Sequence, residues 1–252
     1  MGEGKIKGVI LAGGEGRRLR PLSYYFQKCM IPIGNSQKPL LEYIINLLKH
    51  HGITDIRVLV GYKHQQITNY FGDGGRFGVS LKYVHDDPSI KGTGSALLNL
   101  YKRDKLDPKD SILIYYGDIL SNINLTEMLN QHRESGAAVT LAIVCGYQVP
   151  VGVARLNGNK IVGLVEKPTL ELPVGIGILV LNAEVLEKLA QLEEEGEELD
   201  IMRDFIPHLI EEGFPVHAYI TKCFWYDVGS TEKYEKLDNG LLEKYFSFLF
   251  KP

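Results

Sequence analysis

The chain has few cysteines, and their spacing argues against a cysteine-based metal site or a disulfide framework. Cys29, Cys145 and Cys223 are odd in number, far apart along the chain and without CxxC spacing. The chain also lacks an apolar run of the roughly 20 residues that a membrane span needs. Its first residues, MGEGKIKG, lack the apolar segment of a signal peptide. We therefore expect a reduced, cytoplasmic protein that has no membrane partner.

A strong excess of charge of either sign is missing as well. The formal net charge is −3 over 252 residues, which gives no general attraction to nucleic acid. Hydrophobic residues make up 44% of the chain and charged residues 23%, which are the proportions of a soluble globular protein. A chain of this length can bury a full core. We expect one domain over residues 1–252 and no nucleic-acid partner.

A glycine-rich turn near the amino end is the most informative stretch. The apolar run 9–11 predicts a buried strand, and glycines at 13, 14 and 16 follow it directly. Arginines at 17, 18 and 20 come next. The turn is neither GxGxxG nor a P-loop, because no Lys-Ser or Lys-Thr follows the glycines. The pattern predicts a cradle for a triphosphate; the alternative is a tight turn beside an exposed basic face.

Strands and helices are expected to alternate through the first half of the chain. Apolar runs predict strands at 7–11, 56–60, 80–85 and 111–116, and helical spacing predicts helices at 39–50, 64–71 and 93–101. In the second half we expect strands at 138–144, 152–156, 160–166, 176–181 and 215–220, and helices at 184–192, 204–212 and 231–250. Asn157-Gly158 is a hairpin signal. The order predicts an α/β fold with a mixed, mostly parallel sheet and helices on both faces.

Two aspartates follow apolar runs and are candidate metal ligands. Asp118 comes just after the strand 111–116, and Asp227 ends the stretch FWYD. In open α/β sheets the ligand crevice lies beyond the carboxyl ends of the strands. Two hard oxygen ligands, completed by phosphate oxygens and water, suit Mg²⁺. The alternative for Asp118 is a turn aspartate, since Gly-Asp is a common turn pair.

The stretch from 9 to 32, VILAGGEGRRLRPLSYYFQKCMIP, resembles the signature of the sugar-1-phosphate nucleotidyltransferases, GGxGTRLxPLTxxxPKPMxP. The matching residues are Gly13, Gly14, Gly16, Arg18, Leu19, Pro21, Leu22, Lys28, Met30 and Pro32. Arg17 stands where threonine is usual, and Gln27 and Cys29 replace two prolines. The resemblance implies a Rossmann-like three-layer nucleotidyltransferase fold. It also implies a short form of the family, without the C-terminal β-helix domain.

Further segments extend the resemblance and assign roles. Asp227 lies in a W-x-D-x-G-[ST] segment, and 166–168 match an EKP motif. The implied catalytic residues are Arg18, Lys28, Asp118 and Asp227, with Asp118 and Asp227 as the Mg²⁺ ligands. The implied nucleotide contacts are Leu11, Gly13, Gly14, Gly16, Arg18, Gly92 and Asp118. The implied sugar-phosphate contacts are Gly152, Glu166, Lys167 and Trp225. The alternatives are a surface ion pair for Glu166-Lys167 and a strand-start glycine for Gly152.

The base is expected to lie near two neighbouring segments. GTGSA at 92–96 resembles the family's GTAGA, which opens a helix beside the nucleobase, and Thr93 is a plausible N-cap. HDDP at 85–88 occupies the region that reads the base edge. By this division the nucleotide half spans about 1–120, the sugar-phosphate half about 121–230, and a C-terminal helix 231–250.

The expected activity is nucleotidyl transfer. A sugar-1-phosphate of the glucose or mannose type attacks the α-phosphate of an NTP with Mg²⁺ as cofactor, giving an NDP-sugar and pyrophosphate. Such a step needs alignment and charge stabilisation rather than a nucleophilic side chain, and no Ser/His/Asp or Cys/His arrangement is evident. Two alternatives stay open: a non-catalytic regulatory subunit of the same fold, and a cytidylyltransferase for a non-sugar phosphate. A homo-oligomer is an allowed assembly.

Overall fold

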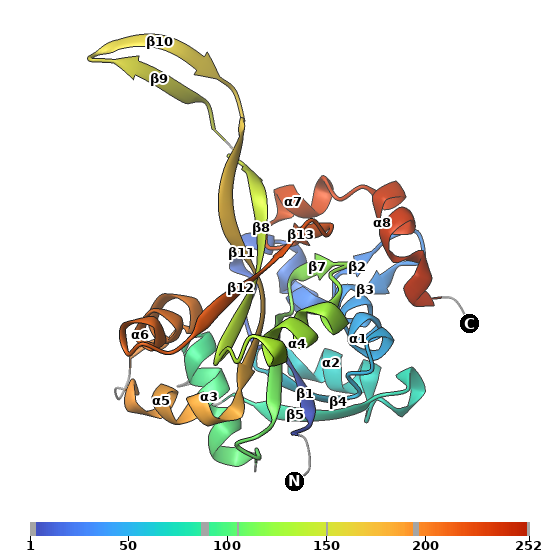
Figure 1. Cartoon of the computed structure of the whole chain (residues 1–252). Helices are drawn as coiled ribbons and strands as arrows, with labels where there is room; N and C mark the ends of the chain where they lie inside the picture. Colours follow the sequence, from blue (N-terminus) through green and yellow to red (C-terminus); the bar gives the residue numbers. More distant parts are fainter. Residues whose placement is uncertain (1–3, 87–90, 105, 150, 194–196, 251–252) are drawn as a thin grey trace.

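A seven-stranded sheet forms the centre of the fold (Figure 1). The computed structural model describes residues 4–86, 91–104, 106–149, 151–193 and 197–250. The strands lie in the order β12 (Val216–Thr221), β8 (Val139–Gln148), β11 (Thr169–Asn182), β6 (Ser111–Tyr116), β1 (Ile6–Ala12), β4 (Asp55–Val60) and β5 (Ser80–His85). Both predicted halves of the chain therefore contribute strands to one sheet.

The sheet is mixed and mostly parallel. Strands β5, β4, β1 and β6 run parallel to one another, and β12 runs parallel to β8. Only β11 is antiparallel to both of its neighbours, β6 and β8. This arrangement confirms the predicted fold class. Strands β8 and β11 are longer than predicted, because they pair with each other from Val139 and Leu181 out to Gln148 and Thr169.

Helices cover the sheet on both faces, which confirms the three-layer arrangement. Side chains alternate across β1, so that Ile10 and Ala12 join one hydrophobic core while Val9 and Leu11 join the other. Burial on both faces explains why this strand is continuously apolar. Helices α1 (Leu40–His50), α2 (His64–Phe71) and α4 (Leu125–Glu134) pack on the first face, and α3 (Thr93–Arg103), α5 (Leu186–Gln191) and α6 (Ile206–Glu211) on the second. None of the described helices is long and apolar enough to cross a bilayer.

Helix α4 was not predicted, although its sequence carries a start signal. The side chain of Asn124 accepts a hydrogen bond from the backbone N–H of Glu127, which caps the first turn. Leu125, Met128 and Leu129 are buried at helical spacing. The cap and the spacing together would have placed this helix.

The prediction of one helix over 231–250 is wrong. The segment contains α7 (Thr231–Glu235), α8 (Asn239–Phe246) and a final 3-10 turn, Ser247–Phe250. Asp238 separates the two helices, because its carboxylate accepts hydrogen bonds from the N–H groups of Gly240 and Leu241 and so starts α8. Phe246 is buried against Tyr43, with ring centroids 5.8 Å apart. The apolar C-terminal segment thus packs on the domain.

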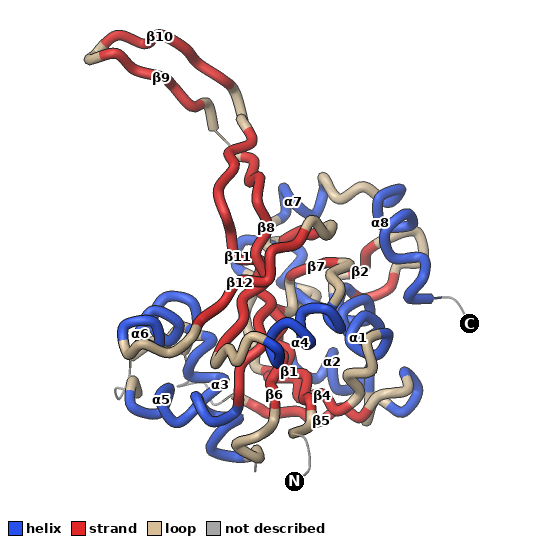
Figure 2. Tube along the Cα trace, viewed as in Figure 1, coloured by secondary structure: helices blue, strands red, loops and turns tan. Residues whose placement is uncertain are grey.

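A hairpin projects from the body of the molecule. Strands β9 (Val153–Asn157) and β10 (Lys160–Val165) form a separate two-stranded sheet beyond the ends of β8 and β11 (Figures 1 and 2). The turn between them contains Gly158, whose φ of 54° lies in the left-handed region that favours glycine. The Asn157-Gly158 hairpin prediction is therefore confirmed. We call residues 153–165 the arm.

Candidate active site

Three loops meet where parallel strands of the sheet end. Leu11 lies opposite Tyr116, and Ala12 lies opposite Val60, so β1, β6 and β4 end side by side. The N–H of Gly117 donates to the carbonyl of Leu11 at 3.0 Å. The N–H of Tyr62 donates to the carbonyl of Gly13 at 3.0 Å. The glycine turn is thus held against the loops that follow β4 and β6.

The glycine turn lies over Lys28. A Cβ atom placed on Gly14 would lie 3.5 Å from Nζ of Lys28, and one on Gly16 would lie 3.0 Å from Cβ of Lys28. Gly16 has a φ of 65°, a conformation that strains residues with a side chain. The predicted nucleotide contact Leu11 has a buried side chain in the core, so only its backbone borders this region.

An ion pair links Lys28 to Asp118. Nζ of Lys28 donates to Oδ2 of Asp118 at 2.9 Å, and each side chain is 19% exposed. Burial acts to raise the pKa of Asp118, but the charge and hydrogen bond of Lys28 outweigh it and hold the pKa below its usual value. Burial acts to lower the pKa of Lys28, but the charge of Asp118, with a smaller effect from Asp227, raises it. Both groups are therefore charged at neutral pH.

Asp227 reaches the same place through a short pairing of strands that was not predicted. Strand β13 (Trp225–Asp227) is antiparallel to β7 (Ile119–Ser121), with Asp227 opposite Ile119. The N–H of Val228 donates to the carbonyl of Asp118 at 2.9 Å. The two aspartates, more than a hundred positions apart in the sequence, are thus brought to adjacent strands.

Arg18 and Lys233 complete this cluster of charges. A Cβ atom on Gly229 would lie 3.2 Å from Nη2 of Arg18 and 2.5 Å from Oδ1 of Asp227. Nζ of Lys233, from α7, lies 2.5 Å from Oδ2 of Asp227. No motif in the sequence assigns a role to Lys233. Its place in the first turn of a helix that starts just after the W-x-D-x-G-[ST] segment could have identified Lys233 as a site residue.

The donor atoms in this cluster suit a hard cation whose coordination shell is completed by oxygen atoms of a substrate. Asp118 and Asp227 offer carboxylate oxygens, and no three His, Cys, Asp or Glu side chains of the described residues come together as a full ligand set. Burial raises the pKa of the neighbouring Cys29 thiol to about 12, so it stays neutral at pH 7. Mg²⁺ prefers oxygen ligands and is usually held by one or two carboxylates plus phosphate oxygens. The residues present fit that cation.

Gln27 explains one departure from the family signature. Its side chain is fully buried, and Nε2 donates to the carbonyl of Ala12 at 2.6 Å. Its Oε1 accepts from the N–H of Cys29, also at 2.6 Å. One amide therefore ties the end of β1 to the residues on either side of Lys28. The signature that the sequence resembles has prolines at positions 27 and 29, whereas here the hydrogen bonds of one amide hold this backbone.

Asp86, from the segment predicted to read the base edge, lies next to the glycine turn. A Cβ atom on Gly13 would lie 2.7 Å from Oδ2 of Asp86, and burial raises the pKa of that carboxyl. Asn99 Nδ2 donates to the carbonyl of His85 at 3.1 Å. Asp87 and Pro88, from the same predicted segment, lie outside the described residues.

The backbone at Leu199 packs against the amino end of α3. A Cβ atom on Gly92 would lie 2.3 Å from the carbonyl oxygen of Leu199, which accepts from the N–H of Gly94 at 2.8 Å. Thr93 is not the N-cap that was predicted. It is the first residue of α3, and its hydroxyl donates to Asp200 instead. Gly92 therefore has a packing reason as well as its predicted role at the nucleotide.

The predicted sugar-phosphate residues lie at the root of the arm. A Cβ atom on Gly152 would lie 2.9 Å from Oε2 of Glu166, so these two residues meet across the hairpin. Gly152, Glu166 and Lys167 are all exposed. The pKa of Glu232 in α7 is lowered by the hydrogen bond and charge of Lys236 and, less, by the charge of Lys167. The root of the arm thus faces α7, which carries Lys233.

Trp225 is only partly available for a sugar. It is half-buried in β13 and packs against the first hydrophobic core. Its place two residues before Asp227 keeps it beside the charge cluster. The structure therefore gives it a packing role, and its contact with sugar phosphate stays a prediction.

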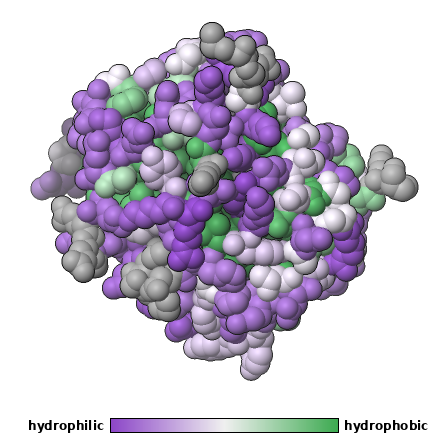
Figure 3. Space-filling view, turned by 90° about the horizontal axis from the view of Figure 1, so that it is seen from below, coloured by the Kyte–Doolittle hydropathy of each residue, from purple (hydrophilic) through white to green (hydrophobic). Residues whose placement is uncertain are grey.

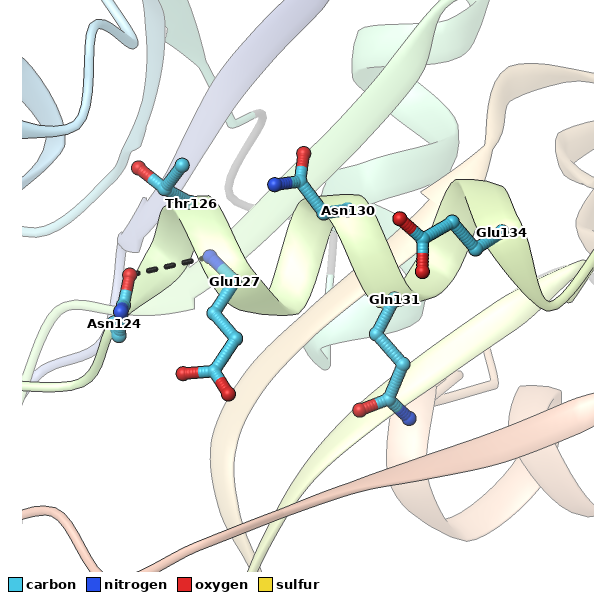
Figure 4. Close-up of a pocket in the computed structure, with 6 residues that line it drawn as sticks. All are labelled: Asn124, Thr126, Glu127, Asn130, Gln131 and Glu134. Atoms are coloured by element: carbon cyan, nitrogen blue, oxygen red, sulfur yellow. Dashed lines mark hydrogen bonds between the residues drawn. The ribbon is translucent and has the colours of Figure 1, made fainter.

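Two open hollows lie elsewhere on the surface. One runs along α4, lined by Asn124, Thr126, Glu127, Asn130, Gln131 and Glu134 (Figure 4). Its charged groups are two carboxylates and no cation, which is the wrong sign for phosphate. The other lies at the amino ends of β1 and β4, where its charges pair internally, as in Lys7–Asp110 at 2.8 Å and Arg57–Asp104 at 2.6 Å. Neither hollow includes the cluster around Lys28 and Asp118.

Comparisons with known proteins point to one family. A family model described as "Nucleotidyl transferase" matches residues 7–244. The chain is 32% identical to a UTP–glucose-1-phosphate uridylyltransferase of Synechocystis sp., over 95% of the chain and 64% of that relative. It is 31% identical to a glucose-1-phosphate thymidylyltransferase of Streptomyces griseus (94% and 66%) and 28% identical to a mannose-1-phosphate guanylyltransferase of Mycobacterium tuberculosis (93% and 64%). The chain thus spans just under two thirds of the length of these relatives.

Solved structures share the fold. A Bacillus anthracis structure with bound sucrose aligns with a TM-score of 0.75 at 24% identity, over 94% of each chain. HddC from Yersinia pseudotuberculosis aligns with a TM-score of 0.69 at 21% identity, over 91% of this chain and 96% of that one. At these identities the likeness concerns the architecture alone.

We predict that Gln27→Ala lowers the free energy of unfolding. The change leaves the Ala12 carbonyl and the Cys29 N–H buried without partners, and each such group costs roughly 1–3 kcal/mol. Urea unfolding followed by circular dichroism measures the loss. Gln65→Ala is the matched control, because Gln65 is exposed on α2. Equal midpoints for the two variants would show that the Gln27 amide does not hold the loop.

We also predict how acid acts on the Lys28–Asp118 pair. Because the native pKa of Asp118 is lowered, the pair contributes stability at pH values above the ordinary aspartate pKa. That contribution is lost as the pH falls through the lowered native pKa. The difference in unfolding free energy between the wild type and Asp118→Asn should therefore be largest near pH 7 and shrink on acidification. A difference that is constant with pH contradicts the ion pair.

Proposed function

Because the chain belongs to the nucleotidyl transferase family, we propose that it makes an NDP-sugar and pyrophosphate from an NTP and a sugar-1-phosphate. The observation that carries the proposal is the cluster in which Lys28 pairs with Asp118 beneath the glycine turn, with Asp227 on the adjacent strand. The relatives are named for transfer to glucose- or mannose-1-phosphate, which supports a sugar phosphate as the acceptor. GTP, dTTP, UTP and CTP are the nucleotides to be compared.

In the proposed reaction an oxygen of the sugar phosphate attacks the α-phosphorus of the NTP in line. One phosphorus–oxygen bond forms to the sugar phosphate, and the bond to the β-phosphate breaks as pyrophosphate leaves with its electron pair. The attacking oxygen is already anionic, so no general base is needed. The protein contributes position and charge, which are the main requirements of phosphoryl-type transfer.

Each residue of the cluster has a separate role in the proposed reaction. Lys28 lies under the Gly13–Gly16 turn, where we place the α-phosphate, and its ammonium stabilises the charge of the transition state. Arg18, whose guanidinium lies beside Gly229 and Asp227, binds the leaving pyrophosphate. Asp118 and Asp227 would hold Mg²⁺, which supplies positive charge to the phosphate oxygens when bound. Lys233 neutralises Asp227 in the structure described here.

The root of the arm provides the second substrate site. Lys167 gives the sugar phosphate a cation, and Glu166 accepts hydrogen bonds from sugar hydroxyls. Gly152 permits close approach, since a side chain there would meet the Glu166 carboxylate. Helix α7 connects the two substrate sites. The charge of Lys167 helps to lower the pKa of Glu232 in this helix, and Lys233 of the same helix pairs with Asp227.

We predict that Asp118→Asn abolishes turnover while the native fold is kept. The change removes one carboxylate charge from the proposed cation site but preserves the size of the side chain. A pyrophosphate-release assay over the four nucleotides and several sugar phosphates measures turnover. Asp238→Asn is the control, because asparagine caps a helix as well as aspartate does. Near-normal, Mg²⁺-dependent turnover of Asp118→Asn would contradict the role of Asp118 as a metal ligand.

We predict that Lys28→Ala lowers kcat by roughly two to three powers of ten, the effect of losing a preorganised electrostatic group. The same pyrophosphate-release assay gives kcat and KM separately. Lys82→Ala is the control, since Lys82 is exposed on β5 and lines the hollow that excludes the charge cluster. A rise in KM alone would assign Lys28 to binding. No turnover of the wild type with any pair of substrates would favour a regulatory subunit.

A further inference from the structure

The loop that leads to Lys28 leaves its aromatic side chains exposed. Tyr24 is 56% exposed, Tyr25 73% and Phe26 40%. The face of the molecule away from the arm, by comparison, is mostly hydrophilic (Figure 3). Aromatic side chains that stay so exposed gain little free energy from burial. Contacts of another kind therefore hold the middle of residues 23–27, which we call the aromatic loop.

Lys63 bonds the first part of the aromatic loop. It lies just before helix α2, and its Nζ donates to the carbonyl of Ser23 at 3.0 Å and also to the carbonyl of Tyr24. The φ of Lys63 is 53°, in the left-handed region that is uncommon for a residue with a side chain. Residues held in such conformations cluster at functional positions. The uncommon conformation thus occurs at the residue whose ammonium bonds the loop.

Gln66 bonds the second part of the aromatic loop. Its Nε2 donates to the carbonyl of Tyr25 at 2.7 Å, and its Oε1 accepts from the N–H of Gln27, also at 2.7 Å. Gln27 comes directly before Lys28 in the chain, and its own side chain accepts from the N–H of Cys29. The amide of Gln66 therefore fixes the backbone from which the Lys28 side chain starts.

Helix α2 is a firmly packed base for these two side chains. Ile67 is fully buried and Phe71 is 2% exposed, and both belong to the first hydrophobic core. Just before the helix, the N–H of Tyr62 donates to the carbonyl of Gly13 at 3.0 Å. The segment 62–66 is thus bonded both to the glycine turn and to the aromatic loop. It sets the spacing between the turn and Lys28, where the α-phosphate is proposed to bind.

We infer that Lys63 and Gln66 are positioning residues, which align Lys28 with the glycine turn. The inference rests on the proposed function, because the aligned group is the ammonium assigned to the α-phosphate. A misplacement of about 1 Å caused by a change away from the reacting atoms can cost roughly 100-fold in rate. The hydrogen bonds of both residues go to the aromatic loop, while Lys28 itself bonds Asp118. Both residues therefore act through the loop.

The pyrophosphate-release assay tests the inference on Gln66→Ala, which removes both hydrogen bonds of this side chain. Its kcat should fall roughly 10- to 100-fold, while KM for the NTP stays within about threefold of the wild type. Gln65→Ala is the matched control, because Gln65 is the preceding residue of α2 and is exposed. It should keep the wild-type kcat. A wild-type kcat for Gln66→Ala would overturn the inference.

A double-mutant cycle separates positioning from a general effect on the fold. In a Lys28→Ala background the group to be aligned is already missing, so adding Gln66→Ala should change kcat by less than about threefold. If the same fold-loss occurs in both backgrounds, Gln66 acts independently of Lys28 and the inference is wrong.

Lys63 provides a second pair of variants. Lys63→Met keeps the length of the side chain but removes the donor, so it should lower kcat. Lys63→Arg keeps donors for the carbonyls of Ser23 and Tyr24, so it should recover most of that loss. Equal losses for the two variants would contradict a role through these carbonyls. Far-UV circular dichroism checks that each variant is folded.

Hydrogen exchange tests the same contact without turnover. In Gln66→Ala the N–H of Gln27 loses its partner, so a peptide covering 22–30 should exchange at least about tenfold faster than in the wild type. Peptides from β1 and β4 should be unchanged. Unchanged exchange over 22–30 would overturn the inference whatever the activity. A wild type without turnover would contradict the proposed function instead, and the exchange rates would still decide whether Gln66 holds the backbone before Lys28.

Discussion

The pair of Lys28 and Asp118 depends on the parallel arrangement of β1 and β6. Asp118 follows the end of β6, and Lys28 lies beneath the turn that follows β1, which passes close to it because residue 16 is a glycine with a φ of 65°. Replacing a well-packed buried ion pair by apolar groups is often neutral for stability. The pair therefore matters mainly because it fixes where its two charges lie. It holds two opposite charges, little exposed, at the edge where strands of an α/β sheet present ligands.

The carboxyl-terminal part of the chain is attached to that pair by backbone hydrogen bonds. The bond from Val228 to Asp118 and the β7–β13 pairing place Asp227 beside it, and α7 then brings Lys233 to Asp227. The result is a cluster in which each carboxylate has a lysine partner and Arg18 lies close by. Three cations and two carboxylates leave the charges of such a cluster nearly balanced. In the proposed reaction the phosphates would pair with the cations and a divalent ion with the carboxylates, so that no buried charge would be left unpaired.

The sequence predicts those features that repeat along the chain. The apolar runs of β1, β4 and β6 indicate strands buried on both faces, and from them the mixed sheet and its helical layers follow. The pairing of β7 with β13 was missed because it involves only three residues on each side and joins segments that are far apart in the sequence. The break at Asp238 was missed because the apolar spacing of 231–250 continues past it. Lys233 and Gln27 were missed as site residues because their roles depend on contacts and not on a pattern.

The arm carries the proposed sugar contacts at its root and not along its length. Its two strands bring Gly152 to Glu166 where the hairpin leaves β8 and β11. Lys167 follows with a φ of 48°, a left-handed conformation that is uncommon for a residue with a side chain. Residues held in such conformations cluster at ligand-binding positions, so the backbone of Lys167 agrees with its proposed contact with the sugar phosphate.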